Sequence, residues 1–335
     1  AGPVEAYESL ITEYIEAWKD FYPDRAAALG LEDYRDRAAD RSSEGVGSWV
    51  ARNDSVLEAI AEAPAALPLD VRIDLRLIQS RGRSEVTRWG GEGGGQEERD
   101  GAPSFPLGRD AFESELRLFY DMELTPEEVA ESALAEIRET RRLLAETAMA
   151  HWRETRGEES EPPEERALIT WALDAMEENR PSTQQESLEA FSRFADEAEA
   201  FVRDAGIATL PTERTLEIVL TPPSAGPAQR IGFVNAAPPF DSGAFTVLSL
   251  PTIEDTYPAL EKEDFYRSFN NHFNKAIIIH ELFPGHYMQG KINARNPRPA
   301  RIFFPHAPYS EGWATLVERI ALDAGWDDGN RLTFL

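Results

Sequence analysis

Apolar side chains recur at steps of three and four residues along most of this chain, and that spacing restricts it to a mainly helical fold. The first such stretch runs from about Val4 to Asp20, with its apolar residues on one helix face. Similar patterns predict helices at about residues 46–63, 70–89, 126–153, 164–178 and 184–204. The first 210 residues or so are therefore predicted to form a helical frame.

One helix start is marked by three residue types in the right order. Thr125 can cap the helix, Pro126 suits its first position, and Glu128 can complete a capping box. A long helix is therefore predicted from here to about Arg153.

The period changes at about residue 215. Three short segments are rich in β-branched or aromatic residues and are bounded by Pro, Gly and Asn, namely Thr215–Leu220, Ile231–Val234 and Ala244–Leu250. They predict a small antiparallel sheet. A helical pattern returns at about Lys262, so the sheet is expected beside the helices that carry the histidines.

No convincing linker interrupts the chain, so one helical domain is predicted over residues 1–335. It would contain the helical frame at about 1–210, the sheet at about 214–250 and the metal-site helices at about 262–325.

The composition excludes several classes of protein. With 41% apolar residues in 335, the chain can bury a sizeable core. Its formal net charge of −27 is spread along its length, which argues against nucleic acid or an anionic membrane as a partner. No apolar run approaches the roughly 20 residues needed to cross a bilayer, so a soluble protein without membrane insertion is predicted. The chain contains no cysteine, so a metal would have to be bound by His, Asp or Glu.

The sequence leaves the compartment and the oligomeric state open. The chain begins at Ala1 without a methionine, so a cytoplasmic protein and an exported one that has lost a signal segment both fit. It stops at Leu335 without a closing signal, and we expect that more chain once followed.

The histidines are clustered. Four of the five lie within one short stretch of the chain: His272, His280, His286 and His306. The central string is His280-Glu281-Leu282-Phe283-Pro284-Gly285-His286, and it follows the apolar run Ala276 to Ile279. The first histidine of the string is therefore expected to emerge from a buried helix.

The spacing of this string differs from that of the usual zinc motif. In HExxH, histidines four apart share one helix face and a zinc ion, and the intervening Glu polarises water. His280 and His286 are six apart, so an unbroken helix would turn the second imidazole about 120° away from the first. Pro284 and Gly285 disfavour a continuous helix. A local break could bring both imidazoles to one ion, with Glu281 beside it.

A third ligand is expected to be a carboxylate on a following helix. Two neutral imidazoles and one carboxylate leave a zinc ion positively charged, with an open position for water. Glu311 lies 25 residues after His286 and opens a segment with helical spacing that runs to Leu322. Its position suits a second metal-bearing helix.

Two motifs give the chain a resemblance to a known family. Residues 280–289 form the extended pattern HExxPGHxxQ, and residues 311–314 form EGWA. In both, the sequence resembles the bacterial domain-of-unknown-function family 885. Weaker similarity reaches upstream to residues 21–30 and 124–128, so the resemblance spans nearly the whole chain.

The resemblance implies a helical metallopeptidase of the gluzincin type. By motif position, it makes His280, His286 and Glu311 the ligands of a zinc ion, Zn2+, and Glu281 the base that activates water. Family members usually continue past the EGWA helix into further helices that are expected to hold substrate. The resemblance therefore implies either a chain that is truncated at its C-terminus or one that holds the metal without all of the catalytic apparatus.

Each candidate residue also has an ordinary structural interpretation. The paired histidines could mark a buried helix that ends at a Pro-Gly turn, and Glu281 could be a surface carboxylate. His306 is a candidate catalytic residue, as a substrate contact or a transition-state donor, or a loop histidine without a role. Gln289 and Glu318 match the family pattern and could hold ligand nitrogens by hydrogen bonds, or could lie on a helix surface.

The remaining histidines and two tyrosines are weaker candidates. For His272 a helix-surface position is favoured over a place near the ligands, and His151 is taken as incidental. Tyr287 and Tyr309 could donate to an oxyanion, although buried packing with a hydrogen-bonded hydroxyl is commoner.

We therefore predict a zinc-dependent hydrolase, first of all a peptidase in which metal-activated water attacks the peptide bond and Glu281 is the general base. The small sheet could align an extended substrate by backbone hydrogen bonds. Two alternatives stay open: a metal-dependent hydrolase of a small non-peptide amide, and a metal-binding helical module without catalysis. The expected partner is a peptide or small amide substrate.

Overall fold

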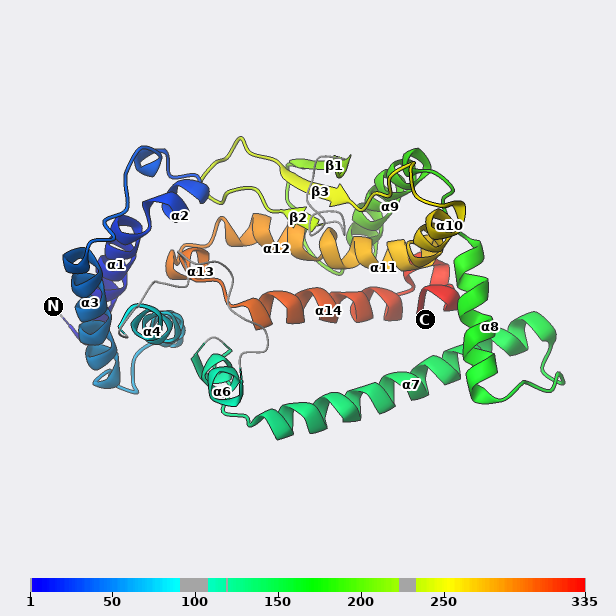
Figure 1. Ribbon diagram of the computed structural model, residues 1–335, viewed down its shortest axis with the longest axis horizontal. Coiled ribbons are helices and arrows are strands. Elements are labelled where there is room, and N and C mark those ends of the chain that lie inside the picture. Colours follow the sequence, from blue (N-terminus) through cyan, green and yellow to red (C-terminus); the bar gives the residue numbers. More distant parts are fainter. Residues whose placement is uncertain (1, 91–107, 119, 223–232, 335) are drawn as a thin grey trace. The chain divides into compact units, whose positions relative to one another are not determined.

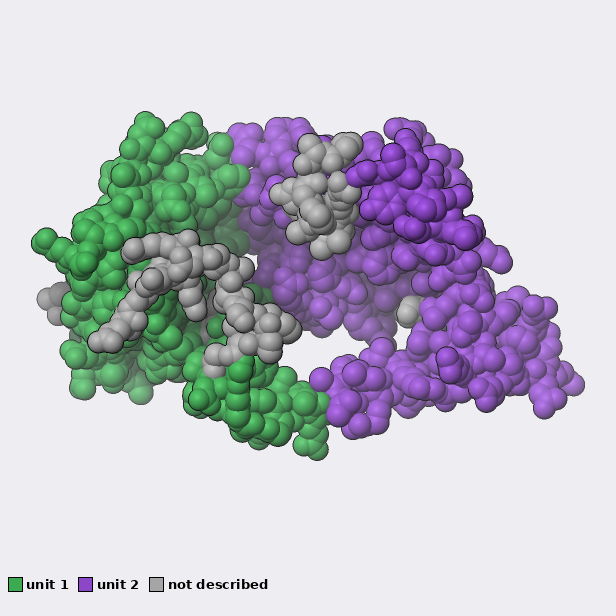
Figure 2. Space-filling view, in the orientation of Figure 1, with its two compact units in different colours: residues 1–132, 238–242, 293–308 green, residues 133–237, 243–292, 309–335 purple. Residues whose placement is uncertain are grey.

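The computed structural model describes residues 2–90, 108–118, 120–222 and 233–334. Its contacts divide the chain into two compact units (Figure 2). Unit 1 comprises residues 1–132, 238–242 and 293–308, and unit 2 comprises residues 133–237, 243–292 and 309–335. The single domain over 1–335 stays a prediction, and the two units are described separately.

Unit 1 is built from helices (Figure 1). They are α1 (Pro3–Phe21), α2 (Pro23–Ala28), the 3-10 helix η1 (Glu32–Tyr34), α3 (Ser43–Ala61), α4 (Leu69–Trp89), α6 (Arg109–Leu118) and α13 (Ala300–Phe303). The long helix α7 (Pro126–Arg156) begins in unit 1 and continues in unit 2.

Aromatic side chains fill the core of unit 1. The stripe predicted for α1 is buried, and its Tyr14 and Trp18 pack against aromatic rings of α3 and α13. A carboxylate also lies in this core, where Glu85 accepts hydrogen bonds from the Tyr22 hydroxyl at 2.6 Å and the Trp49 indole at 2.8 Å. Both partners donate to one carboxylate oxygen, and the buried charge is compensated by Arg81, whose Nε lies 3.2 Å from the other oxygen.

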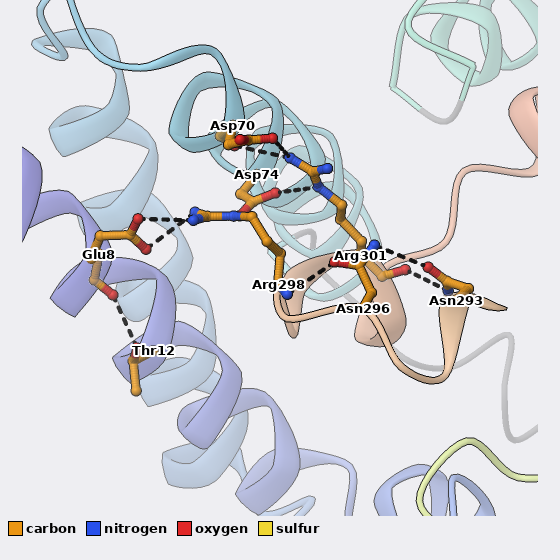
Figure 3. Close-up of polar contacts among 8 residues, drawn as sticks. All are labelled: Glu8, Thr12, Asp70, Asp74, Asn293, Asn296, Arg298 and Arg301. Carbon is orange, nitrogen blue, oxygen red and sulfur yellow. Dashed lines mark hydrogen bonds and ion pairs between the residues drawn. The ribbon is translucent and has the colours of Figure 1, made fainter.

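A second polar network holds residues 293–308 to α1 and α4 (Figure 3). Asp74 of α4 is only 1% exposed and accepts hydrogen bonds from the Nε atoms of Arg298 and Arg301. Arg298 also donates to both carboxylate oxygens of Glu8 on α1, at 3.0 and 3.1 Å. The Asn293 amide donates to the Arg301 carbonyl at 3.2 Å, so the start of this segment is fixed as well.

Unit 2 contains helices and a small sheet (Figure 1). After α7 follow α8 (Glu165–Glu178), α9 (Gln184–Asp204), β1 (Leu216–Leu220), β2 (Phe233–Asn235), β3 (Thr246–Leu250), α10 (Ala259–Ser268), α11 (Asn271–Glu281), α12 (His286–Asn293), α14 (Ala307–Asp323), and the 3-10 helices η3 (Trp326–Gly329) and η4 (Arg331–Phe334). The last residue of α12 and the first two of α14 belong to unit 1.

The three strands have the order β1-β3-β2, and the sheet is mixed. β2 pairs with β3 in the antiparallel sense, but β1 pairs with β3 in the parallel sense, so the predicted purely antiparallel sheet is wrong. The residues of a strand favour extended backbone without fixing the direction of its neighbour. The 25 residues between β1 and β3 are long enough for a crossover to the same end of the sheet. Of the predicted strand Ile231–Val234, residues 231 and 232 lie outside the described residues.

The sheet packs with the helices that carry the histidines, as predicted. One buried cluster joins Phe191 and Phe194 of α9, Leu248 of β3, and Ile278 and Ile279 of α11. The apolar run before His280 is thus in the core of unit 2, and this burial fixes the rotation of α11.

The mainly helical fold is confirmed. The helix predicted at Gln184 to Asp204 has the same bounds in the structure. At the start of α7 the capping box is formed, because Glu128 N donates to Thr125 Oγ1 at 3.2 Å and Thr125 N donates to the Glu128 carboxylate at 2.8 Å. None of the helices in the described part of the chain is both long and apolar enough to cross a membrane.

Candidate metal centre

The first histidine of the string lies at the C-terminal end of α11. The helix begins at a capped position, where the Asn270 side chain accepts hydrogen bonds from the backbone N–H groups of His272 and Phe273. Near its other end Ile278 and Ile279 are buried. The next residue, His280, is only partly buried.

The predicted break between the two histidines is present. α11 ends at Glu281 and α12 begins at His286, and the Phe283–Pro284 peptide bond between them is cis. At Gly285 the chain passes so close to α11 that a Cβ atom would lie 1.6 Å from the His280 carbonyl oxygen. Only glycine fits there, so the break depends on that residue.

The break brings both imidazoles to one carboxylate. Glu311 Oε2 on α14 lies 3.8 Å from His280 Nε2 and 3.5 Å from His286 Nε2. The two imidazole rings are nearly perpendicular, with centroids 4.9 Å apart. One ligand atom from each of the three residues lies within 4.8 Å of the others, so the three predicted ligands converge.

These separations fit a divalent metal such as zinc. With zinc–ligand bonds of about 2.1 Å in a tetrahedral site, ligand atoms lie roughly 3.4 Å apart. The two nitrogen–oxygen distances of 3.5 and 3.8 Å are close to this value. The Glu311 side chain is 65% exposed, whereas both histidines are mostly covered, so the site opens on its carboxylate side.

Glu318 contacts the His280 imidazole at Nδ1, the ring nitrogen that does not face Glu311. It lies seven residues after Glu311 on α14, about two turns further along the same face. Its carboxylate oxygen is 2.5 Å from His280 Nδ1, which leaves Nε2 directed toward Glu311. The hydrogen bond with Glu318 raises the pKa of His280 above its ordinary value, although partial burial opposes the rise. Glu318 therefore contacts His280, and its role of holding a metal-ligating nitrogen stays a prediction.

Glu281 is the half-buried carboxyl group between the two histidines in sequence. Burial raises its pKa above the ordinary value for glutamate, His280 and His286 oppose the rise, and Glu311 adds to it. A carboxyl group with a raised pKa accepts and releases a proton at a pH nearer neutrality, which suits a general base.

Gln289 contacts α14 in the structure. One turn after His286 on α12, its side-chain oxygen accepts a hydrogen bond from the Ser310 hydroxyl at 2.9 Å. Its amide nitrogen is buried and has no hydrogen-bond partner among the described residues. The prediction that Gln289 holds a ligand nitrogen stays a prediction.

The other two histidine candidates, His306 and His272, lie in different surroundings. His306 belongs to unit 1, whereas the three converging residues belong to unit 2, and its catalytic role stays a prediction. The surface position favoured for His272 is wrong, because this side chain is 5% exposed and its Nδ1 lies 3.0 Å from Thr333 Oγ1. η4, which supplies Thr333, covers it, and nothing in the sequence near His272 indicates that contact.

The two tyrosines have unlike surroundings. Tyr287 is buried, and its hydroxyl accepts a hydrogen bond from the backbone N–H of Thr215 at 3.0 Å, which fits the packing interpretation. Tyr309 is exposed. His151 lies on α7, where its ring stacks on Trp171.

Two residues that contact the segment around His286 were not identified as site residues from the sequence. Ser310 and Trp313 flank Glu311, and both contact the segment around His286. The sequence feature that could have identified them is the EGWA motif, because Ser310 directly precedes it and Trp313 belongs to it.

Comparisons with known proteins support the fold and the family. A candidate lipoprotein of unknown function from Shewanella oneidensis is 19% identical, with a TM-score of 0.56 over 87% of this chain and 53% of that one. A candidate lipoprotein from Colwellia psychrerythraea is 14% identical, with a TM-score of 0.51 over 87% of this chain and 50% of that one. The chain thus spans about half the length of these two structures, which show the fold alone.

The sequence comparisons are more specific. No curated protein matches the sequence. The profile of the family described as bacterial protein of unknown function, DUF885, matches residues 94–335. Since the match covers more than half of the sequence and includes both motifs, the chain belongs to the bacterial DUF885 family.

Proposed function

We propose that this protein is a zinc-dependent hydrolase, and specifically a metallopeptidase of gluzincin-like architecture. The observation that carries the proposal is the convergence of His280, His286 and Glu311 on one point, with Glu281 next to the first ligand. Two imidazoles and a carboxylate are a donor set typical of catalytic zinc, because three protein ligands leave one position open.

Each residue has a defined task in this proposal. A zinc ion held by the three ligands would polarise the scissile carbonyl and lower the pKa of water toward about 7. Glu281 takes the proton of the attacking water and delivers it to the leaving nitrogen. Glu318 fixes the tautomer and the orientation of His280 through Nδ1.

The sheet favours a peptide over a small amide as substrate. Among the described strands, β1 lies at an edge of the sheet, in the order β1-β3-β2. Thr215, just before β1, donates its backbone N–H to Tyr287, the residue after the ligand His286, so the start of this edge is adjacent to α12. An extended peptide can add to such an edge by main-chain hydrogen bonds, which a small amide does not need.

The first test separates metal binding from catalysis. Glu281→Gln removes the proton acceptor but none of the three ligands, so we expect hydrolysis to fall by roughly a hundredfold or more while about one zinc per chain is retained. Metal content is measured by mass spectrometry, and activity with a panel of peptides. The double substitution His280→Ala, His286→Ala should lose both metal and activity, and Glu261→Gln, at an exposed position of α10, should lose neither.

Each result bears on the proposal. Full activity of Glu281→Gln would exclude Glu281 as the base. Hydrolysis of small amides but not of peptides would replace the peptidase by the alternative amide hydrolase. One zinc per chain without hydrolysis of either substrate class would favour the non-catalytic module.

A further inference from the structure

Trp313 connects the helix that carries Glu311 to the break that precedes His286. It lies on α14 two residues after Glu311, and its indole Nε1 donates a hydrogen bond to the Pro284 carbonyl at 2.9 Å. Only Gly285 separates Pro284 from the ligand His286. A single hydrogen bond therefore ties the segment with one ligand to the segment with another.

The carbonyl of Pro284 lies outside the hydrogen-bond ladders of both helices. In a continuous helix it would accept from the N–H of Met288, four residues on. That N–H donates instead to Leu282 O, at 3.3 Å, because the chain is broken here. Pro284 is buried, and a buried carbonyl without a partner is costly. The indole of Trp313 supplies the missing donor.

A second contact lies one turn earlier on α14. The Ser310 hydroxyl donates to the Gln289 side chain on α12 at 2.9 Å. Ser310 and Trp313 are three residues apart, so they project from neighbouring positions of one helix face, and Glu311 lies between them in sequence. The segment with Glu311 is thus held on both sides against the segment with His286.

We propose that Trp313 and Ser310 are positioning residues for the metal site. They hold Glu311 at the separation from His286 that a shared ion requires, before any ion arrives. Neither residue belongs to the three predicted ligands. Their effect is on metal affinity and coordination geometry, because a preformed ligand set loses less conformational freedom when it binds. This inference rests on the proposed function, since it presupposes that the three ligands bind metal.

The test compares two tryptophans of unit 2 that make the same kind of contact. Trp313→Phe keeps an aromatic ring but removes the donor to Pro284. Trp326→Phe removes a donor to the Lys275 carbonyl at 3.0 Å, a bond that involves neither α12 nor Glu311. Zinc affinity is measured by competition with a chromophoric chelator, and coordination geometry by the visible absorption of bound cobalt(II).

We expect Trp313→Phe to bind zinc roughly tenfold more weakly than the wild type and to shift the cobalt(II) bands. Trp326→Phe should keep wild-type affinity within about twofold and an unchanged spectrum, even if its melting temperature falls. Ser310→Ala, which removes only a hydroxyl, should weaken zinc binding in the same direction, and it serves as the test if Trp313→Phe does not fold.

Wild-type affinity and spectrum in folded Trp313→Phe or, failing that, in Ser310→Ala would overturn the inference and leave the proposed function intact. If the wild type binds neither zinc nor cobalt(II), the proposed function fails and the inference fails with it.

Discussion

At the scale of single residues, Gly285 controls whether two histidines six positions apart can approach the same carboxylate, Glu311. Any side chain there would collide with the His280 carbonyl, and also with the Ile279 carbonyl, which lies 2.4 Å from the position of a Cβ atom. We expect Gly285→Ala to destabilise unit 2 by about 3 kcal/mol and to abolish zinc binding, because the break must open to admit the methyl group. Urea unfolding and zinc competition measure the two effects.

A second glycine of the same region is the control. A Cβ atom at Gly290, on α12, meets nothing within 4 Å. Gly290→Ala should therefore leave zinc binding unchanged and stabilise the helix by up to about 1 kcal/mol. Equal behaviour of the two variants would mean that the close approach at Gly285 has no importance.

The chemistry of individual residues explains which parts of the site were predictable. Pro284 and Gly285 predicted the break from their own chemistry. Proline disfavours helical backbone at the preceding residue, and glycine permits backbone angles that other residues rarely adopt. The Trp313 bond to Pro284 was not predictable, because a carbonyl that lacks a helical partner becomes visible only once the break has its actual shape. The burial of His272 depends on η4, some 60 residues away, and so it escaped a local interpretation as well.

At the scale of elements, Asp327 of η3 joins the end of the described chain to α11. Its carboxylate accepts a hydrogen bond from Thr333 at 2.5 Å and forms an ion pair with Lys275. Burial raises the pKa of Asp327, but His272, Lys275 and Thr333 together outweigh burial and lower it to about 2. The charged form is thus favoured by folding, so its contribution is present above the ordinary pKa of about 3.9 and is lost as the pH falls from there toward 2.

We expect Asp327→Asn to lower the free energy of unfolding by about 2 kcal/mol at pH 7 and by roughly half as much at pH 3, which lies between the two pKa values. The measurement is urea unfolding of wild type and variant at both pH values. Asp328→Asn is the matched control, because Asp328 has nearly the same left-handed backbone, with φ of 55° against 58°, but is exposed. A stability difference for Asp327→Asn that does not change with pH would contradict this assignment.

The position of a helix or strand was predictable where the residues within that element determine it. The helix Gln184–Asp204 was located to the residue by its apolar stripe, which forms part of the core of unit 2. The strands were located within a few residues as well. The parallel pairing of β1 with β3 was not, because it depends on the path of the chain between the strands and not on the strands.

At the scale of the whole molecule, Asp74 joins parts of the chain that are far apart in sequence, because Arg298 lies 224 residues and Arg301 lies 227 residues after it. Asp74→Asn leaves two guanidinium groups without their buried counter-charge, and we expect a loss of about 3 kcal/mol in unfolding free energy. Asp70, which also binds Arg301, is exposed, so Asp70→Asn should cost less than about 1 kcal/mol. Thermal or urea unfolding of the two variants measures both losses. Equal losses of unfolding free energy for Asp74→Asn and Asp70→Asn would show that the burial of Asp74 is unimportant.

The same ion pairs bear on how the protein is made. A ribosome adds about 5 to 20 residues per second, so Asp74 emerges on the order of 10 to 45 s before the first arginine that will neutralise it. During synthesis the N-terminal helices therefore carry a carboxylate whose native burial is not yet compensated, and they can collapse only incompletely. The nascent chain is expected to be a target for chaperones until residues 293–308 have been translated.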